Sequence, residues 1–138
     1  MTLKFHPNPG TILVCDFETG FKSPEMVKKR PAVVVSPRLR KRSDLCTVVP
    51  LSTKEPLPPE AYHYRLSMLH TLPSPFDAPE MWVKCDMIYT VGFHRLDLIK
   101  LPPNRTTGKR KYLQPKVTND DLIAIRSGIQ SALGITHT

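Results

Sequence analysis

Apolar residues along most of this chain either alternate with polar ones or gather in short β-branched runs. Both patterns are typical of strands, because branched and aromatic side chains pack well on a pleated surface. Segment 61–69 alternates apolar with polar positions, which is typical of a half-buried strand. The pattern predicts five strands, at 11–17, 31–36, 45–51, 61–69 and 81–89, and allows one more short strand at 95–101.

One segment near the C-terminus has helical periodicity. An apolar stripe at helical spacing is formed by Leu122, Ile125 and Ile129, followed by Ala132 or Leu133. Thr118 can accept from the first free N–H groups of a helix, and Gly134 can end it. We therefore predict a helix near 119–133, packed on the sheet.

Length and composition favour a single mainly β domain. The 138 residues suffice for one hydrophobic core, so we expect one domain over 1–138. Fifteen prolines against six glycines indicate short, stiff connections, which helical bundles tolerate poorly. The three cysteines lie far apart in apolar runs, so we expect buried thiols rather than a disulfide framework or a zinc site: Cys15, Cys46 and Cys85. No motif implies a metal or a cofactor.

The charge favours anionic partners. Twenty Lys and Arg against 12 Asp and Glu give a formal charge of +8. Nucleic acid, an acidic protein and a membrane surface would each fit, and a merely soluble basic surface would also produce this excess. No apolar stretch approaches the ~20 residues of a membrane span, and the N-terminus has no signal-peptide pattern. We expect a cytoplasmic protein without a membrane anchor.

The centre of the pattern is the segment 28–52. Its two valine-rich runs flank a basic turn, which predicts two adjacent antiparallel strands. Arg30 begins the first strand and Ser52 ends the second, so both fall at the same end of the pair. An arginine and a hydroxyl at one end of a small sheet predict a phosphate site.

Four blocks, taken together and in this order, resemble the MazF, PemK and Kid toxins of type II toxin–antitoxin systems. Arg30-Pro31 before a run of valines opens the second block, and the blocks lie at 9–17, 30–36, 48–53 and 83–91. The resemblance implies a small SH3-like (CcdB/PemK-type) β-barrel that forms a homodimer. It also implies a metal-independent, sequence-selective endoribonuclease toxin that cleaves single-stranded RNA and is neutralised by a cognate acidic antitoxin.

RNA supplies its own nucleophile, the 2′-OH, so a protein needs only to move protons and stabilise charge on phosphorus. Arg30 suits charge stabilisation, because its guanidinium matches phosphate oxygens and stays charged. Ser52 stands where the resembled family usually has threonine, and its hydroxyl can bind a non-bridging oxygen. It could instead cap the backbone at the start of a turn. Thr53 follows directly and could substitute.

Lys84-Cys85-Asp86 is the second candidate. On a strand, Lys84 and Asp86 would point the same way, as an acid–base pair or as a plain ion pair. The resemblance places an arginine and an aspartate of the Kid/PemK branch at these two positions and implicates them in cleavage. Lys84 keeps the charge of that arginine without its bidentate geometry.

The remaining expected RNA contacts are basic or polar residues near the two strands: Lys28, Lys29, Thr53, Arg38 and Arg40. The resemblance implies that loop 18–29 covers the site, although a plain connector fits its sequence too. Loop 102–111 is basic and exceeds the toxin pattern; a solvated surface loop and an RNA contact both fit it. The alternative function is a non-catalytic nucleic-acid-binding or protein-interaction barrel of the same fold.

Overall fold

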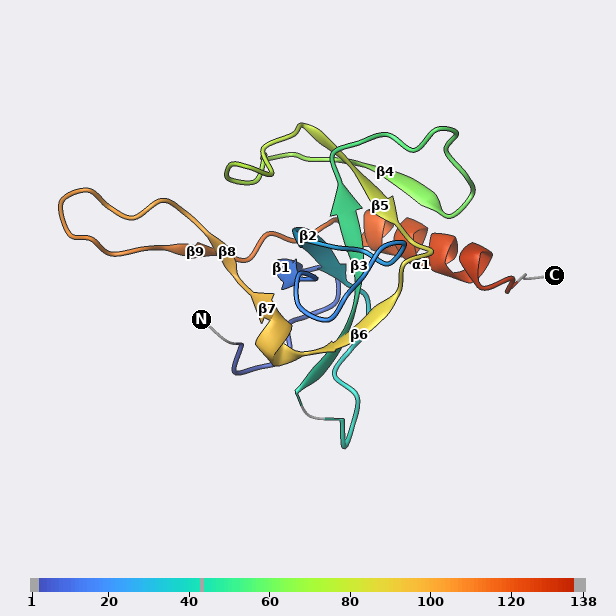
Figure 1. Cartoon of the computed structure of the whole chain (residues 1–138), viewed down its shortest axis with the longest axis horizontal. Coiled ribbons are helices and arrows are strands. Elements are labelled where there is room, and N and C mark those ends of the chain that lie inside the picture. The colour runs from blue at the N-terminus through green and yellow to red at the C-terminus, as the bar shows by residue number, and fades with distance from the viewer. Residues whose placement is uncertain (1–2, 43, 136–138) are drawn as a thin grey trace.

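The computed structural model describes residues 3–42 and 44–135 and shows a mainly β protein with one C-terminal α-helix (Figure 1). This confirms the prediction of a mainly β fold with a C-terminal helix. The strands are β1 (Ile12–Asp16), β2 (Lys29–Val34), β3 (Leu45–Ser52), β4 (His63–Ser67), β5 (Glu80–Lys84), β6 (Tyr89–Gly92), β7 (Leu96–Asp97), β8 (Ile99–Lys100) and β9 (Tyr112–Leu113). A short 3-10 helix spans Phe93–Arg95, and α1 spans Asn119–Ala132.

The main sheet is antiparallel, in the order β4-β5-β3-β2-β1-β7, and β6 pairs with the first half of β3. β3 is long enough to pair with β6 through Leu45 to Val48 and with β5 through Leu51 and Ser52. Over the described residues the ladders end at β4 and β7 without joining. The expected closure into an SH3-like barrel is therefore not confirmed.

The prediction of one strand over 81–89 is wrong. β5 ends at Lys84, and a turn follows in which the Met87 N–H donates to the Lys84 oxygen at 3.1 Å. The turn moves the chain from one half of β3 to the other. The sequence pattern did not predict this turn, because Cys85 and Tyr89 on either side of it are both packed inward, against different clusters.

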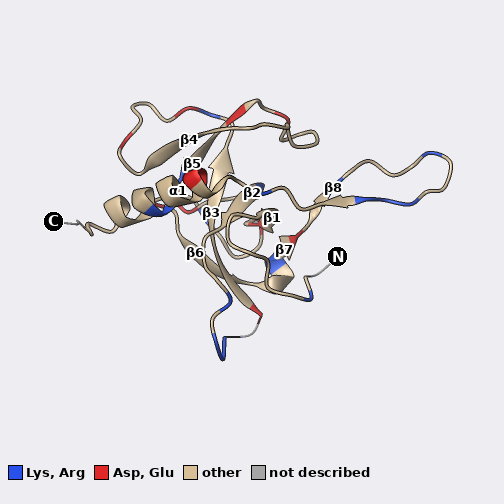
Figure 2. Ribbon diagram, turned by 180° about the vertical axis from the view of Figure 1, so that it is seen from behind, with Lys and Arg blue, Asp and Glu red and all other residues tan. Residues whose placement is uncertain are grey.

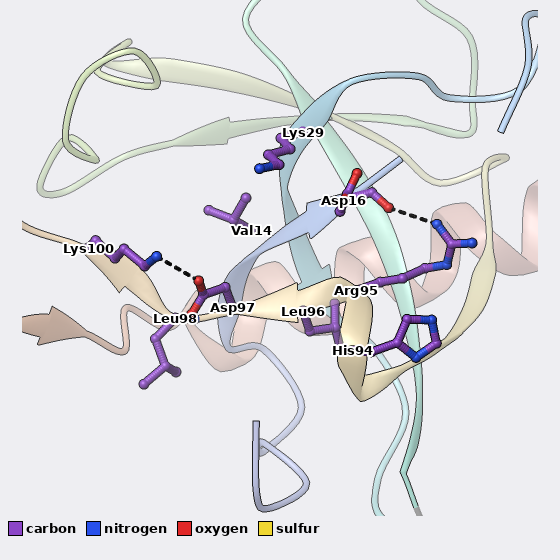
Figure 3. A pocket seen from close by; sticks show the side chains of 9 residues that line it. All are labelled: Val14, Asp16, Lys29, His94, Arg95, Leu96, Asp97, Leu98 and Lys100. Carbon is purple, nitrogen blue, oxygen red and sulfur yellow. Dashed lines mark hydrogen bonds and ion pairs between the residues drawn. The ribbon is translucent and has the colours of Figure 1, made fainter. Parts of the chain in front are cut away.

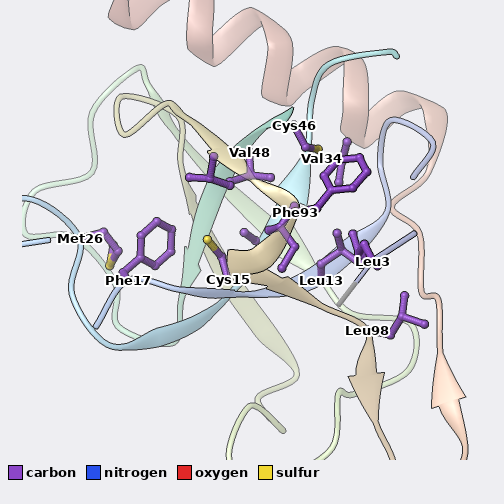
Figure 4. Packing of buried hydrophobic residues seen from close by; sticks show 13 residues of the cluster. Leu3, Leu13, Cys15, Phe17, Met26, Val34, Cys46, Val48, Phe93 and Leu98 are labelled. Atoms are coloured by element: carbon purple, nitrogen blue, oxygen red, sulfur yellow. The ribbon is translucent and has the colours of Figure 1, made fainter. Parts of the chain in front are cut away.

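The core has two parts, one on each face of the sheet. Neighbouring residues of one strand enter different parts: Leu13 packs in the first cluster and Ile12 in the second, because side chains alternate along a strand. Figure 4 shows the first cluster, with Cys15, Val34 and Val48 among its members. The three cysteines are free and buried, as predicted. Burial raises the pKa of Cys15 and Cys85 to about 12 and that of Cys46 to about 11.

Helix α1 packs against the second cluster through Ile125, which is fully buried. Its N-terminus is closed by a capping box: Thr118 Oγ1 accepts from the Asp121 N–H at 3.0 Å, and Asp121 accepts from the Thr118 N–H at 3.2 Å. Tyr64 on β4 donates to Asp121 Oδ1 at 2.5 Å, which fixes the start of the helix against the sheet. No helix within residues 3–42 and 44–135 is long and apolar enough to cross a membrane.

A hairpin formed by β8 and β9 projects from the body of the protein (Figure 1). We call residues 99–113 the arm. Ile99 pairs with Leu113 and Lys100 with Tyr112 at its base, where Ile99 is buried. The allowed strand at 95–101 is thus two short strands, of which β7 joins the main sheet through β1 and β8 enters the arm.

Candidate functional site

The β2–β3 pairing brings Arg30 and Ser52 to one end of the sheet. Ala32 pairs with Pro50 and Val34 with Val48, so Arg30 and Ser52 lie at the end of this ladder away from the connecting loop. A pocket of about 370 Å³ opens there, which we call the cationic pocket. It is lined by Lys28, Lys29, Arg30, Pro31, Leu51, Ser52, Thr53, Lys54, Pro75, Phe76, Met81 and Lys84.

Arg30 is held by its own loop. Its Nε–H donates to the Val27 carbonyl at 3.2 Å, and its side chain is half-buried. Lys28 adopts a left-handed backbone with φ of 73°, and its carbonyl accepts from the Phe17 N–H at 2.9 Å. Pro31 is buried and fixes φ at the next position. These contacts place the guanidinium at the pocket and leave both its terminal amino groups without an acceptor among the described residues.

Ser52 is only 4% exposed, yet it lines the cationic pocket. Its Oγ accepts from the Lys54 N–H at 3.2 Å, so the turn-capping role is present. No described residue accepts the hydroxyl proton. Ser52 can therefore cap the turn and still donate a hydrogen bond to an oxygen atom placed in the pocket.

Lys84 is the last residue of β5, where it pairs with His63 of β4. Its side chain lines the cationic pocket. Asp86 is exposed in the turn that follows and does not line the pocket. The expectation that Lys84 and Asp86 share one strand face is wrong, because the strand ends before Asp86. The structure records no ion pair between their described side chains.

Of the other expected RNA contacts, Lys28, Lys29 and Thr53 line the pocket. Arg38 and Arg40 do not; they are exposed in the β2–β3 loop, at the opposite end of that hairpin. Figure 2 shows this loop as a separate basic tip. They are near Arg30 in the sequence but far from it in the structure, because most of β2 lies between them.

Among the lining residues that were not predicted as site residues, Lys54 and Phe76 are the ones suited to contact RNA. Lys54 follows the turn after β3, and Phe76 reaches the pocket from the β4–β5 loop. Phe76 is half-buried and offers an aromatic surface on which a base could stack. Its segment is proline-rich and has no periodicity, so the sequence held no signal for its place.

The charge of the pocket has one sign. Its ionisable lining side chains are Lys28, Lys29, Arg30, Lys54 and Lys84, and none of the described lining residues is Asp, Glu or His. Clustered cations in a cleft attract phosphates, because low-dielectric walls focus the field. The pocket therefore suits a polyanion. Among the residues that the structure describes, no group of three or more His, Cys, Asp or Glu could hold a metal ion.

A second pocket, of about 290 Å³, lies beside the first and shares Lys29 with it (Figure 3). Lys100 faces it and pairs with Asp97 at 3.0 Å. Arg95 borders it and donates to the carbonyls of Asp16 and Thr19, at 3.2 and 2.7 Å. Its guanidinium also lies 4.7 Å from the centre of the Phe21 ring. These contacts hold the first part of loop 18–28 against the body.

Comparison with known proteins identifies the class of protein. The family model of the PemK-like, MazF-like toxin of type II toxin–antitoxin systems matches residues 8–132. The chain belongs to this family, as the four sequence blocks predicted. It is 34% identical over 108 residues to an uncharacterized protein of Haemophilus influenzae. The aligned region covers 70% of this chain and 73% of that protein.

Solved structures share the fold. An endoribonuclease in complex with its cognate antitoxin, from a mycobacterial species, has a TM-score of 0.64 at 20% identity, over 96% of this chain and 99% of that chain. MazF of Deinococcus radiodurans has a TM-score of 0.57 at 18% identity, over 95% and 99%. At these identities the likeness concerns the fold.

Proposed function

We propose that this chain is an endoribonuclease toxin that cleaves single-stranded RNA at the cationic pocket and is neutralised by a cognate antitoxin. The observation that carries the proposal is the convergence of Arg30, Ser52 and Lys84, from three different strands, on one pocket. Family membership supports it, as do solved structures of the same fold described as endoribonucleases.

In this mechanism the 2′-oxygen of RNA attacks the adjacent phosphorus atom, and the bond from phosphorus to the 5′-oxygen breaks. The products are a 2′,3′-cyclic phosphate and a 5′-OH. Arg30 stabilises the negative charge that grows on the non-bridging oxygens, because its fork can donate two parallel hydrogen bonds. Ser52 donates its hydroxyl proton to one of the same oxygens. Neither step uses a metal ion.

Two proton transfers remain. The Lys84 ammonium lines the pocket and is proposed to protonate the leaving 5′-oxygen. Asp86 is proposed to accept the 2′-OH proton. That role requires the turn after β5 to bring the carboxylate towards the pocket when RNA binds, since catalytic hydrogen bonds often tighten only in the substrate complex.

The proposed assembly is a homodimer that holds RNA in a shared groove. Lys28, Lys29 and Thr53 would contact the strand at the pocket, whereas Arg38 and Arg40 would contact a more distant part of the RNA or the acidic antitoxin. Light scattering at micromolar concentration in moderate salt tests the assembly. A monomer under these conditions would count against the dimer.

One observation favours a non-catalytic RNA-binding protein instead. The described lining of the cationic pocket contains no carboxylate and no imidazole, the usual groups for proton transfer. The proposed nuclease and this alternative both bind RNA, but only the nuclease cleaves it.

Cleavage of single-stranded RNA in EDTA, with analysis of the product ends, decides between them. We expect cleavage by the wild-type chain, with 2′,3′-cyclic phosphate and 5′-OH ends, and its loss in Arg30→Ala. RNA binding without cleavage by the wild-type chain, across a mixed pool of sequences, would support the alternative. A requirement for divalent metal would overturn the mechanism.

A further inference from the structure

The arm and its return segment hold much of the positive charge of the protein. Residues 98–119 include no Asp or Glu and carry six cations: Lys100, Arg105, Lys109, Arg110, Lys111 and Lys116. Because the segment has six positive and no negative side chains, it accounts for six units of positive charge in a chain whose net charge is +8. The four cations from Arg105 to Lys111 are exposed and form no ion pair with a described residue. Figure 2 shows them along the projecting hairpin.

Backbone hydrogen bonds give the arm a defined shape. The Leu101 N–H donates to the Lys111 carbonyl at 3.0 Å, and the Asn104 N–H donates to the Lys109 carbonyl at 2.7 Å. At the tip, Asn104 Oδ1 accepts from the N–H groups of Thr106 and Thr107. The basic side chains are therefore presented from an ordered hairpin.

The base of the arm is fixed to the body on both sides. Ile99 is buried in the second cluster where the chain enters the arm. Where it returns, the Pro115 carbonyl accepts from the Ile12 N–H at 2.8 Å, and the Val117 N–H donates to the Gly10 carbonyl at 2.9 Å. These hydrogen bonds attach the return segment of the arm to the start of β1 and to Gly10 just before it.

Two cations, Lys29 and Lys100, lie between the cationic pocket and the tip of the arm, in a pocket that also contains the carboxylates of Asp16 and Asp97. Lys29 lines both pockets, and Lys100 lines the second pocket while also belonging to β8. Figure 3 shows Lys29 and Lys100 on either side of Val14, a half-buried apolar side chain. A polyanion in the cationic pocket can therefore continue over Lys29 and Lys100 onto the arm.

We propose that the arm is a second RNA-binding surface, which holds the backbone of RNA beyond the cleaved phosphate. The inference rests on the proposed function, because it assumes an RNA strand in the cationic pocket. Lysine and arginine contacts to phosphates strengthen binding without reading the sequence. The arm therefore increases affinity for long RNAs and leaves the choice of cleaved sequence to the pocket.

The composition of the arm favours nucleic acid over a protein partner. Stable protein interfaces are centred on buried aromatic and aliphatic anchors, and their cores are poor in lysine. The only large apolar side chains exposed on the arm are Tyr112 and Leu113, each 37% exposed, at its base. Its tip carries threonine, asparagine, glycine and cations.

The test compares two triple variants that lose equal charge. The arm variant carries Lys109→Gln, Arg110→Gln and Lys111→Gln; the control carries Lys4→Gln, Arg65→Gln and Arg126→Gln, exposed cations outside the arm, the β2–β3 loop and both pockets. Affinity is measured for uniformly 2′-O-methylated RNA of about 6 and about 20 nucleotides, sizes that bracket a single-strand site. These RNAs lack the nucleophile, so the wild-type protein can be used. Thermal unfolding confirms that each variant is folded.

For the long RNA, we expect the arm variant to lose at least about tenfold in affinity and the control markedly less. The slope of log affinity against log salt should fall by about 2, since each lost phosphate contact on a single strand contributes about 0.7. For the short RNA the two variants should match. Equal loss in both variants on the long RNA would overturn the inference by assigning the effect to net charge.

Two further outcomes also overturn the arm's role. One is unchanged affinity of the arm variant for long RNA. The other is unchanged RNA affinity together with weakened binding of a 20-residue polyglutamate peptide, which would assign the arm to an acidic protein. Failure of the proposed function looks different: the wild-type chain would then cleave no unmodified RNA, whatever the arm binds.

Discussion

Arg30 donates its Nε–H to the main-chain oxygen of Val27, 3.2 Å away, and this contact fixes the guanidinium at the edge of the cationic pocket. The two terminal amino groups remain available for a phosphate. An arginine tethered in this way loses little freedom when it binds, since the fork is already oriented.

We predict that Arg30→Ala lowers the single-turnover cleavage rate by about 10²–10³, or roughly 3–4 kcal/mol in the barrier. Arg30→Lys should lose nearly as much, because an ammonium group lacks the fork. RNA affinity should fall far less, since the other cations of the pocket remain. A folded Arg30→Ala protein that cleaves at the wild-type rate would remove Arg30 from the mechanism and leave it to Lys84 and Asp86.

Ser52→Ala should affect both stability and rate. The substitution leaves the Lys54 N–H without its acceptor, at a cost of about 1 kcal/mol in the free energy of unfolding. It also removes a donor to the phosphate, so the cleavage rate should fall, though less than in Arg30→Ala. Ser52→Thr keeps the hydroxyl and should retain or gain activity. Thr53→Ala, at the exposed neighbouring position, is the matched control for urea unfolding, and its cleavage rate compares the two neighbouring hydroxyl groups of the pocket. A greater loss in Thr53→Ala would transfer the role to Thr53.

The local elements of the fold could be predicted because each has a short-range cause. Alternation and β-branching located the strands, and Thr118 with the stripe at Ile125 located the helix. The hairpin pattern predicted that Arg30 and Ser52 lie at the same end of the strand pair, and both line the cationic pocket. The family could be identified from the order of four blocks, which no single block would have supported.

Features that depend on where the chain turns could not be predicted. The apolar pattern continues through the turn after Lys84, so Asp86 was placed on a strand that ends before it. Phe76 and Lys54 lie on irregular segments whose sequence has no period. Arg38 and Arg40 are near Arg30 in the chain, but the length of β2 carries them to the other end of the sheet.

Acid should destabilise the protein partly through Asp121. Burial alone would raise the pKa of this carboxyl, but the hydrogen bonds from Tyr64 and Thr118 outweigh it, so the pKa is lowered. The same hydrogen bond to Asp121 raises the pKa of Tyr64 to about 12. A lowered folded-state pKa stabilises the protein above the unfolded value of about 3.9, and that contribution is lost as the pH falls through the folded-state pKa.

Asp121→Asn should therefore lower the free energy of unfolding at pH 7 by about 1 kcal/mol, since it weakens the capping box. Below about pH 4 the difference from wild type should shrink. Urea unfolding of both proteins between pH 7 and pH 3 measures this difference in the free energy of unfolding. Asp120→Asn, an exposed neighbour in the same helical turn, is the control and should show little of the pH-dependent difference. Parallel curves for wild type and Asp121→Asn would contradict the assignment.

Gly128 is buried on the face of α1 that packs against Cys85, the residue that follows β5. A Cβ added there would lie 2.9 Å from Cys85 Sγ and 3.1 Å from Cys85 Cβ, and Cys85 is fully buried. Overpacking of this kind costs about 1–3 kcal/mol, whereas the better helix propensity of alanine returns about 1 kcal/mol. Gly128→Ala should therefore lower the free energy of unfolding in net terms, while Ser127→Ala, on the exposed side of the helix, should change it by less than about 0.5 kcal/mol.

The cause can be isolated with a double-mutant cycle. Cys85→Ala removes the sulfur atom that the new Cβ would meet, so Gly128→Ala should cost less in that background than in the wild type. Urea unfolding of the four proteins gives the coupling free energy. If the two substitutions are additive, the sulfur atom is not what limits the approach of α1, and Cys85 Cβ, which alanine retains 3.1 Å from the added Cβ, becomes the next contact to test.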